Sequence, residues 1–141
     1  MEPLSLKYAL TGITTERFGA LHEPKTRDVL LNVSVGIKTS YNDRRLGLAL
    51  LVKFEEKRTV FMEIETTCHF QIEDHDWNEL SNGMQRNVEL PKEFVQHLLS
   101  ICVGVTRGVL HSKTENTPYN KYFLPLIDIS QIGVKSVVIE R

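Results

Sequence analysis

The chain has 141 residues, the size of one domain, and its 41% hydrophobic and 25% charged residues are typical of a folded globular protein. With 17 Lys and Arg against 18 Asp and Glu, and no basic stripe with interleaved aromatic residues, nucleic acid is not an expected partner. No apolar run is long enough for a membrane span and no signal-peptide pattern is present, so we expect one cytoplasmic domain, residues 1–141, without membrane insertion.

Four segments alternate apolar and polar residues with the two-residue period of a β-strand. The first is short, residues 6–10, and the others are residues 29–37, 46–54 and 60–72. Short polar connections join the last three segments, so these strands are expected to be antiparallel neighbours. The sequence therefore predicts a three-strand meander with the N-terminal strand at one edge, which makes a four-stranded antiparallel sheet with one apolar face.

Residues 73–79 follow the last strand and are rich in carboxylates. Their spacing matches neither an EF-hand loop nor a helical histidine pair, so the sequence favours a solvated loop that Trp77 anchors to the core. His69 lies on the predicted wet face of the sheet, where no nucleophile can be placed beside it. Cys68 and Cys102 are expected to be small buried residues rather than a disulfide framework. We therefore expect no catalytic residue, no metal site, no cofactor and no enzyme.

Pro91 opens a segment with helical spacing that extends to about Lys113. Its apolar residues form two adjacent stripes. The first stripe consists of Phe94, Leu98, Ile101, Cys102, Val105 and Val109. The second stripe consists of Val95, Leu99, Val103 and Leu110. A helix that is apolar over so wide an arc needs a partner on each flank, and we expect one flank to bury on the sheet and the other on an identical helix.

Gly104 and Gly108 lie four residues apart on this helix. Each costs about 1 kcal/mol of helix propensity relative to Ala, and close approach of a second backbone would account for their presence. The predicted oligomer interface therefore comprises Val95, Leu99, Val103, Gly104 and Gly108.

The passage after the helix has two features with two interpretations each. Arg107 is either a cation near the negative end of the helix dipole or a side chain that binds carbonyls of the crossing segment 113–125 and fixes its path. Tyr119, Tyr122 and Phe123 either close the core or border an apolar groove that is open to a partner.

Three stretches, in this order, resemble the SecB export-chaperone family. Residues 61–64, F-M-E-I, continuing to Phe70, are similar to the family's long strand of the form F-x-E-V. Residues 105–110, V-T-R-G-V-L, resemble its helix motif V-S-R-G-x-F. Residues 124–129, L-P-L-I-D-I, are similar to its A-P-V-N-F segment with a one-residue insertion. Order and spacing hold from about residue 4 to residue 129, so the resemblance covers most of the chain.

The resemblance implies an α+β fold in which one long helix covers one face of a four-stranded antiparallel sheet. It also implies a crossing loop that helps to wall a groove for unfolded polypeptide, and homodimers or homotetramers built through helices and edge strands. By the same resemblance, Glu63 is a candidate partner-facing carboxylate. Two departures argue against docking of the SecA motor: residues 130–141 favour a strand where the family has a second helix, and the chain is nearly neutral where the family is acidic.

Two functions follow from this reasoning. The first is an ATP-independent chaperone or adaptor that holds non-native or extended polypeptide, such as a nascent secretory protein or an antitoxin. Its groove would use exposed strand backbone and non-directional apolar burial at about 25 cal/mol per Å². The predicted groove residues are Phe94, Leu98, Tyr119, Tyr122 and Phe123. The second function is a non-catalytic structural or assembly module that reuses the fold in a fixed homo-oligomer.

Overall fold

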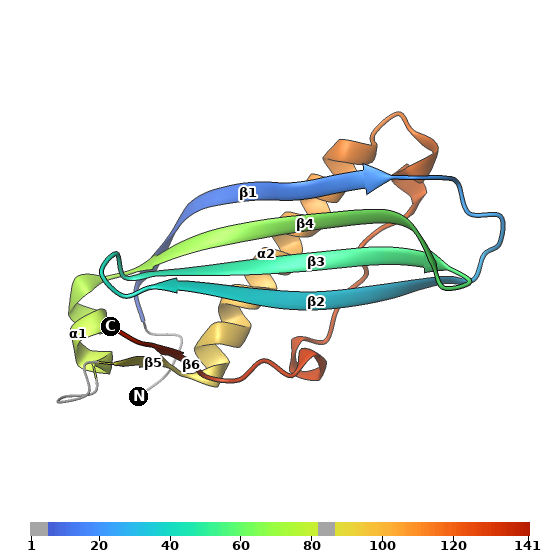
Figure 1. Ribbon diagram of the computed structural model, residues 1–141. Coiled ribbons are helices and arrows are strands. Elements are labelled where there is room, and N and C mark those ends of the chain that lie inside the picture. The colour runs from blue at the N-terminus through green and yellow to red at the C-terminus, as the bar shows by residue number, and fades with distance from the viewer. Residues whose placement is uncertain (1–5, 82–86) are drawn as a thin grey trace.

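The computed structural model describes residues 6–81 and 87–141. Its main element is a four-stranded antiparallel sheet with the strand order β1-β4-β3-β2 (Figure 1). The strands are β1 (Tyr8–Ala20), β2 (Val29–Ser40), β3 (Arg45–Glu56) and β4 (Thr59–Ile72). The predicted α+β fold class is confirmed, with β2, β3 and β4 as the meander and β1 pairing with β4 at the edge.

Tight turns join the strands of the meander, in which the β3–β4 pairing has one register shift, between Phe54 and Glu55. Lys57 and Arg58, between β3 and β4, have φ values of 51° and 68°. Two successive positive φ values are typical of the two-residue hairpin turn whose twist matches that of the strands. Between β2 and β3, the Ser40 hydroxyl donates to the Asp43 carboxylate at 3.0 Å, which closes the turn. As a result, the 12 residues of β2 all pair with β3 without a break in register.

β1 is longer than the sequence predicted. It continues to Ala20 instead of ending at Leu10. Its pairing with β4 shifts in register between Leu10 and Gly12 and again between Thr15 and Arg17. Each shift interrupts the two-residue alternation by which a strand is recognised in a sequence, so residues 11–20 carry no clear strand signal.

The predicted long helix is α2 (Lys92–Thr114), which crosses one face of the sheet obliquely (Figure 1). Pro91 is its N-cap, and Phe94, Leu98 and Cys102 are buried in the core between helix and sheet. In the described part of the chain, no helix combines the length and the apolar character needed to cross a membrane.

The second stripe of α2 is also buried within the single chain. Val95, Leu99 and Val103 belong to the same hydrophobic core as the first stripe, so these three side chains are unavailable to a second copy. The sequence had placed them in an oligomer interface. The physical reason for the difference is that the chain returns after α2 and covers this flank itself.

The returning chain contains two short 3-10 helices and a strand. They are η3 (Pro118–Lys121), η4 (Ile129–Ile132) and β6 (Val137–Ile139), and β6 pairs antiparallel with β5 (Val88–Leu90). Val137 and Ile139 belong to the same hydrophobic core as the buried residues of α2. The strand expected within residues 130–141 is therefore present.

Residues 73–79, expected to be a loop, instead belong to the short helix α1 (Asp74–Leu80). Asp74 and Asp76 lie in its first turn, where negative charge is favoured by the helix dipole. Trp77 is buried, and its ring meets Tyr41 edge-on with centroids 5.4 Å apart. Trp77 anchors the segment as expected, but through a helix that is too short to show helical periodicity in the sequence.

Candidate polypeptide-binding surface

Arg107 connects α2 to the chain that crosses the sheet. Its Nε donates to the Leu124 carbonyl and its Nη2 donates to the Pro125 carbonyl, both at 2.8 Å. A planar guanidinium can make two such bonds at a fixed angle, so it sets both the position and the direction of the loop. This is the geometry expected of a loop-positioning side chain.

The aromatic residues of the crossing segment divide into an anchored and an exposed group. Tyr122 is half-buried and meets Phe61 edge-on, with ring centroids 5.2 Å apart, and a second ring, that of Phe54, lies 6.4 Å away. Tyr119 is also half-buried. In contrast, Phe123 is 57% exposed, so the loop both closes the core and presents an aromatic ring to solvent.

The edge strand β2 carries apolar side chains that the rest of the chain leaves partly open. Among the described residues β2 pairs with β3 alone, so its other edge has free backbone donors and acceptors. Its odd-numbered residues face the same side as α2, because the β3 partners of Leu31, Val33, Val35 and Ile37 are all buried core residues. We name these side chains the β2 row: Val29, Leu31, Val33, Val35 and Ile37.

Exposure of the β2 row follows from the dimensions of the two layers. A helix with its side chains is about 10 Å wide, whereas four strands at about 4.8 Å spacing make a wider sheet. One helix therefore covers the central strands and leaves the edges partly open. Leu31 is 36% exposed and Ile37 is 42% exposed. The sequence places these residues on the core face but contains no signal for how far the helix reaches.

Two depressions lie along the β2 row, each walled by the returning chain. The first, the Tyr122 pocket, has a volume of about 510 Å³. Its lining residues are Pro24, Lys25, Thr26, Arg27, Val29, Lys121 and Tyr122. The second, the tail pocket, has a volume of about 350 Å³. Its lining residues are Val33, Ser34, Val35, Ile37, Ile132, Gly133, Val134 and Lys135. Both volumes are in the range of clefts that hold one or more side chains.

Two of the predicted groove residues are absent from this surface. Phe94 and Leu98 are 0% exposed, because they lie in the interior between α2 and the sheet. Tyr8 of β1 packs edge-on against Phe94 with ring centroids 5.6 Å apart. Of the other predicted groove residues, Tyr122 lines one of the two pockets, whereas Tyr119 and Phe123 line neither and remain predictions. The candidate surface also includes the β2 row, which was not predicted.

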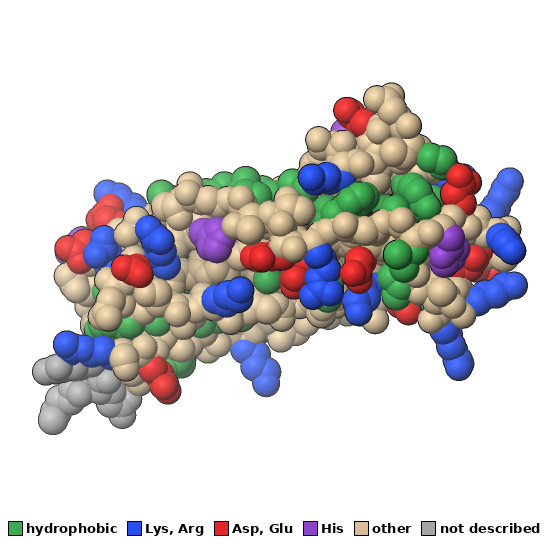
Figure 2. Space-filling model, turned by 45° about the horizontal axis from the view of Figure 1, so that its top comes forward, with side chains coloured by type: hydrophobic (Ala, Val, Ile, Leu, Met, Phe, Trp, Pro, Cys, Tyr) green, Lys and Arg blue, Asp and Glu red, His purple; other side chains and the backbone are tan. Residues whose placement is uncertain are grey.

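A different apolar surface lies at the opposite edge of the sheet, beside β1. Figure 2 shows hydrophobic side chains gathered in a band along the β1 side of the molecule. Leu10 and Ile13 of β1 are 42% and 49% exposed, although they are on the face toward α2. The half-buried Ile101 and Val105 lie on α2, on the same helix face as His97, which bonds to Tyr8 of β1 at 2.8 Å. We name Leu10, Ile13, Ile101 and Val105 the β1 strip.

The two glycines of the predicted oligomer interface lie beside this strip. Gly104 and Gly108 are both exposed, and a Cβ atom built at either position would have no neighbour within 4 Å. No contact inside the single chain therefore requires glycine at these positions. Of the five residues predicted to form an interface between copies, only these two glycines are exposed, and their contact with a second copy remains a prediction.

Glu63 lies on the outer face of the sheet, away from both pockets. Its Oε1 is 3.8 Å from Nη1 of Arg17, and the same guanidinium is 3.3 Å from Glu65. A partner that uses Glu63 would have to compete with Arg17. Contact of Glu63 with a partner remains a prediction.

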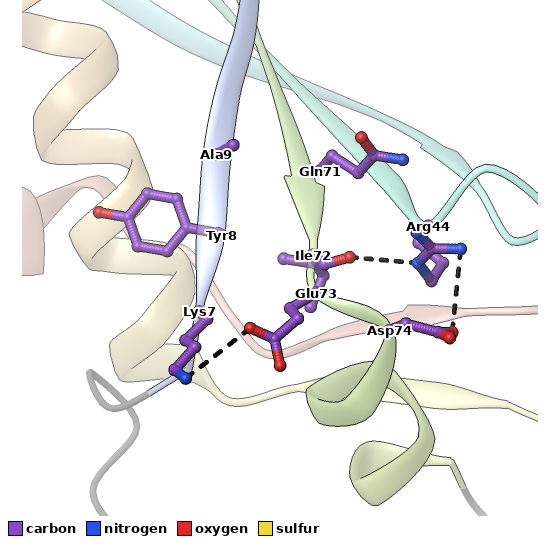
Figure 3. Close-up of a pocket in the computed structure, with 8 residues that line it drawn as sticks. All are labelled: Lys7, Tyr8, Ala9, Arg44, Gln71, Ile72, Glu73 and Asp74. Atoms are coloured by element: carbon purple, nitrogen blue, oxygen red, sulfur yellow. Dashed lines mark hydrogen bonds and ion pairs between the residues drawn. The ribbon is translucent and has the colours of Figure 1, made fainter.

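A hollow at the end of the sheet, lined by Lys7, Arg44, Glu73 and Asp74 among others, has ion pairs between its lining residues. Figure 3 shows Lys7 reaching Glu73 and Arg44 reaching Asp74, at 4.0 and 3.9 Å. Arg44 also donates from Nε to the Ile72 carbonyl at 3.2 Å. These contacts tie the start of β1 and the β2–β3 turn to the start of α1. The hollow is therefore a structural closure of the sheet.

The two cysteines lie together in the core. Cys102 Sγ donates to the carbonyl of Leu48 at 3.5 Å, and Leu48 is the ladder partner of Cys68. The hydrogen bond with Cys102, together with burial, raises the pKa of the Cys68 thiol well above its ordinary value.

Within residues 6–81 and 87–141, no group of three or more His, Cys, Asp or Glu side chains is arranged to hold a metal ion.

Comparison with known proteins reveals similarity in structure and none in sequence. No family model matches the chain, and no curated protein matches it. The fold matches the Mycobacterium tuberculosis Rv1957 SecB-like chaperone, solved in complex with a ChAD peptide from the Rv1956 HigA1 antitoxin. That match has a TM-score of 0.54 and 9% identity and covers 86% of this chain and 91% of that chain.

A second solved structure, a protein of unknown function from Streptococcus agalactiae, aligns with a TM-score of 0.43 and 9% identity over 87% of this chain and 98% of that chain. The first match shows the fold that the sequence motifs had suggested. The chain described here therefore has the fold of a SecB-like chaperone.

Proposed function

We propose that the protein is an ATP-independent chaperone or adaptor that binds extended polypeptide along β2. The observation that carries this proposal is the combination of a SecB-like fold with an open edge strand whose apolar side chains face two pockets. The protein is proposed to be cytoplasmic and to have no catalytic activity of its own.

Binding would use the free edge of β2 and the β2 row together. A client in extended conformation pairs its backbone with the edge strand, as in β-strand addition, and this pairing has no sequence requirement. Alternate client side chains then enter the pockets, where burial contributes about 25 cal/mol per Å² of apolar surface. The client exchanges water for apolar contacts without any chemical step, so no nucleotide is needed.

The chemistry of the site favours extended segments as clients over folded surfaces. The peptide bound to the Rv1957 chaperone comes from an antitoxin, which supports an extended polypeptide as the partner. Both a nascent secretory protein and an antitoxin supply such segments. Docking to a SecA-type motor is not part of the proposal.

Suppression of aggregation tests the proposal. A test protein that unfolds on reduction of its disulfides is followed by light scattering, with and without this chain. Leu31→Glu and Ile37→Glu place a charge in the β2 row and are expected to abolish most of the protection. Leu30→Glu is the matched control, because Leu30 is exposed on the same strand but faces the outer side, opposite Glu55. No protection by the parent chain at molar excess would rule the function out.

A second candidate function is a structural module that forms a fixed homodimer or homotetramer through the β1 strip. The exposed glycines on α2 beside Ile101 and Val105 favour this candidate, because they allow a second backbone to approach closely. A hydrophobic dye at native pH distinguishes the two functions. A client surface stains in the assembled protein, whereas a module whose apolar surfaces are all consumed in the oligomer does not.

A further inference from the structure

We propose that the Tyr122 pocket selects clients in which a carboxylate lies next to an apolar residue. This inference rests on the proposed function and specifies the client chemistry. The site would hold the apolar side chain against Tyr122 and Val29 and the carboxylate against the cations at the rim.

The charge of the pocket is the first observation. Lys25, Arg27 and Lys121 all line it, and none of the carboxylates in the described residues does. All three are exposed, and within the described part of the chain none of them takes part in an ion pair. A concave site lined by one sign of charge attracts the opposite sign. The whole chain has a net charge of only −1, so this concentration of cations is local.

The apolar floor is the second observation. Tyr122 is held on Phe61 and Phe54, so its position is set by the core and not by a ligand. The Nζ atom of Lys121 lies 5.5 Å from the centroid of the Tyr122 ring, which places one cation directly above the floor. A side chain lying on the ring therefore has a cation within reach.

The carboxylate of Glu56 contacts the wall of this pocket without lining it. Glu56 is the ladder partner of Val29, and its Oε2 accepts the backbone N–H of Thr26. This hydrogen bond is the main reason why the pKa of Glu56 lies below its ordinary value. It also fixes the carboxylate on the backbone of the pocket wall. Glu56 therefore shapes the wall while leaving the three cations available to a client.

The tail pocket differs, because Lys135 is the only charged residue that lines it. Val29 in the first pocket and Val33 in the second are four residues apart on β2, which corresponds to about 13 Å along a strand. A client strand aligned with β2 would thus place its carboxylate and apolar pair about four to six residues from a second apolar residue.

The experiment uses three labelled 12-residue peptides that share two apolar residues at this spacing. They carry Asp, Asn or Lys beside the first apolar residue, and binding is followed by fluorescence anisotropy at low and high salt. We expect the Asp peptide to bind about tenfold more tightly than the Lys peptide at low salt, with the Asn peptide between them. High salt should reduce this difference.

Variants assign the selectivity to the pocket. The double variant Arg27→Gln/Lys121→Gln should bind all three peptides equally, whereas Lys53→Gln, on the outer face opposite Asn32, should keep the parent preference. Equal binding of the Asp and Lys peptides by the parent chain would overturn the inference and leave the proposed function intact. Failure of the parent to bind even the Asn peptide would count against the proposed function itself, and the inference would fall with it.

Discussion

The two edges of the sheet differ in regularity and in surroundings. β2 pairs with β3 over all 12 of its residues in one unbroken register, whereas the pairing of β1 with β4 is interrupted twice. The returning chain and a cluster of cations border the α2 side of β2. The α2 side of β1 is bordered by the outer surface of α2, where Gly104 and Gly108 are exposed.

Under the proposed functions, this difference assigns the two edges of the sheet to different uses. β-Bulges disturb an edge and make addition of a further strand less favourable, while a regular edge accepts one. β2 is thus suited to an extended client, and the β1 strip to side-chain packing with a second copy. The variants described next test this division of the molecule, beginning with the largest expected effect.

Phe54→Ala and Phe70→Ala form a matched pair of core substitutions. Phe54 supports Tyr122 on the client side, and Phe70 packs against Tyr8 of β1, with ring centroids 6.0 Å apart. Each variant should lose about 3–5 kcal/mol of unfolding free energy in urea, because a buried ring is replaced by a cavity. We expect only Phe54→Ala to weaken peptide binding and only Phe70→Ala to weaken self-association. Loss of both properties in both variants would mean that the two edges are not independent.

Arg107→Ala removes both bonds between α2 and the crossing segment. Hydrogen bonds from a charged group contribute about 1.5–3 kcal/mol when buried, and the partial exposure of Arg107 reduces this contribution. Amide hydrogen exchange at residues 122–126 should become faster, and peptide affinity should fall. Self-association is expected to stay unchanged. Unchanged exchange in this segment would show that the loop holds its path without Arg107.

Gly108→Ala should have opposite effects on the single chain and on the oligomer. In the single chain an added methyl group has open space, so the helix should gain up to about 1 kcal/mol. If a second helix packs closely at this position, the same methyl group should weaken self-association, as measured by analytical ultracentrifugation. Ser112→Ala, one turn further along, is the control. Stronger or unchanged association in Gly108→Ala would remove the glycines from the interface.

The smallest effect concerns pH and the wall of the Tyr122 pocket. The folded-state pKa of Glu56 lies below its ordinary value of 4.5, chiefly because of the N–H of Thr26. Its contribution to stability is therefore present above the unfolded-state pKa and is lost as pH falls through the folded-state pKa. In Glu56→Gln, the unfolding free energy should depend less on pH below pH 4.5. Amide hydrogen exchange at Thr26 should become faster. A profile identical to that of the parent would show that Glu56 does not hold the wall.

The sequence predicts the central elements well, because the β2–β3 pairing has no register shift and the β3–β4 pairing has only one. The meander and the helix from Pro91 follow from alternation, short turns and a wide apolar arc. The second half of β1 does not, because the register shifts after Leu10 and Thr15 remove the alternation. Local patterns predict elements reliably only where the pairing is regular.

The candidate site was less predictable than the fold. Phe94 and Leu98 have the same apolar character as exposed groove residues, and only the path of the surrounding chain buries them. Leu31 and Ile37 look like core residues in the sequence, and only the limited width of one helix leaves them open. The exposure of these four side chains depends on how far the helix and the returning chain extend over the sheet. No local sequence pattern predicts this extent. Arg107 was easier to interpret, because a helix end followed by a crossing segment offers few carbonyl partners.

The pairing of β5 with β6 joins Val88 to Ile139 and so closes a long chain segment that contains α2 and the crossing loop. A ladder of three residue pairs is short compared with the 12 of β2 and β3, so it is the easier of the two to separate. Val137 and Ile139 of β6 belong to the same hydrophobic core as Val95 and Leu99, so separation of the ladder would expose part of this core. A short ladder thus separates buried apolar surface from solvent, and we expect transient opening of this ladder to promote aggregation.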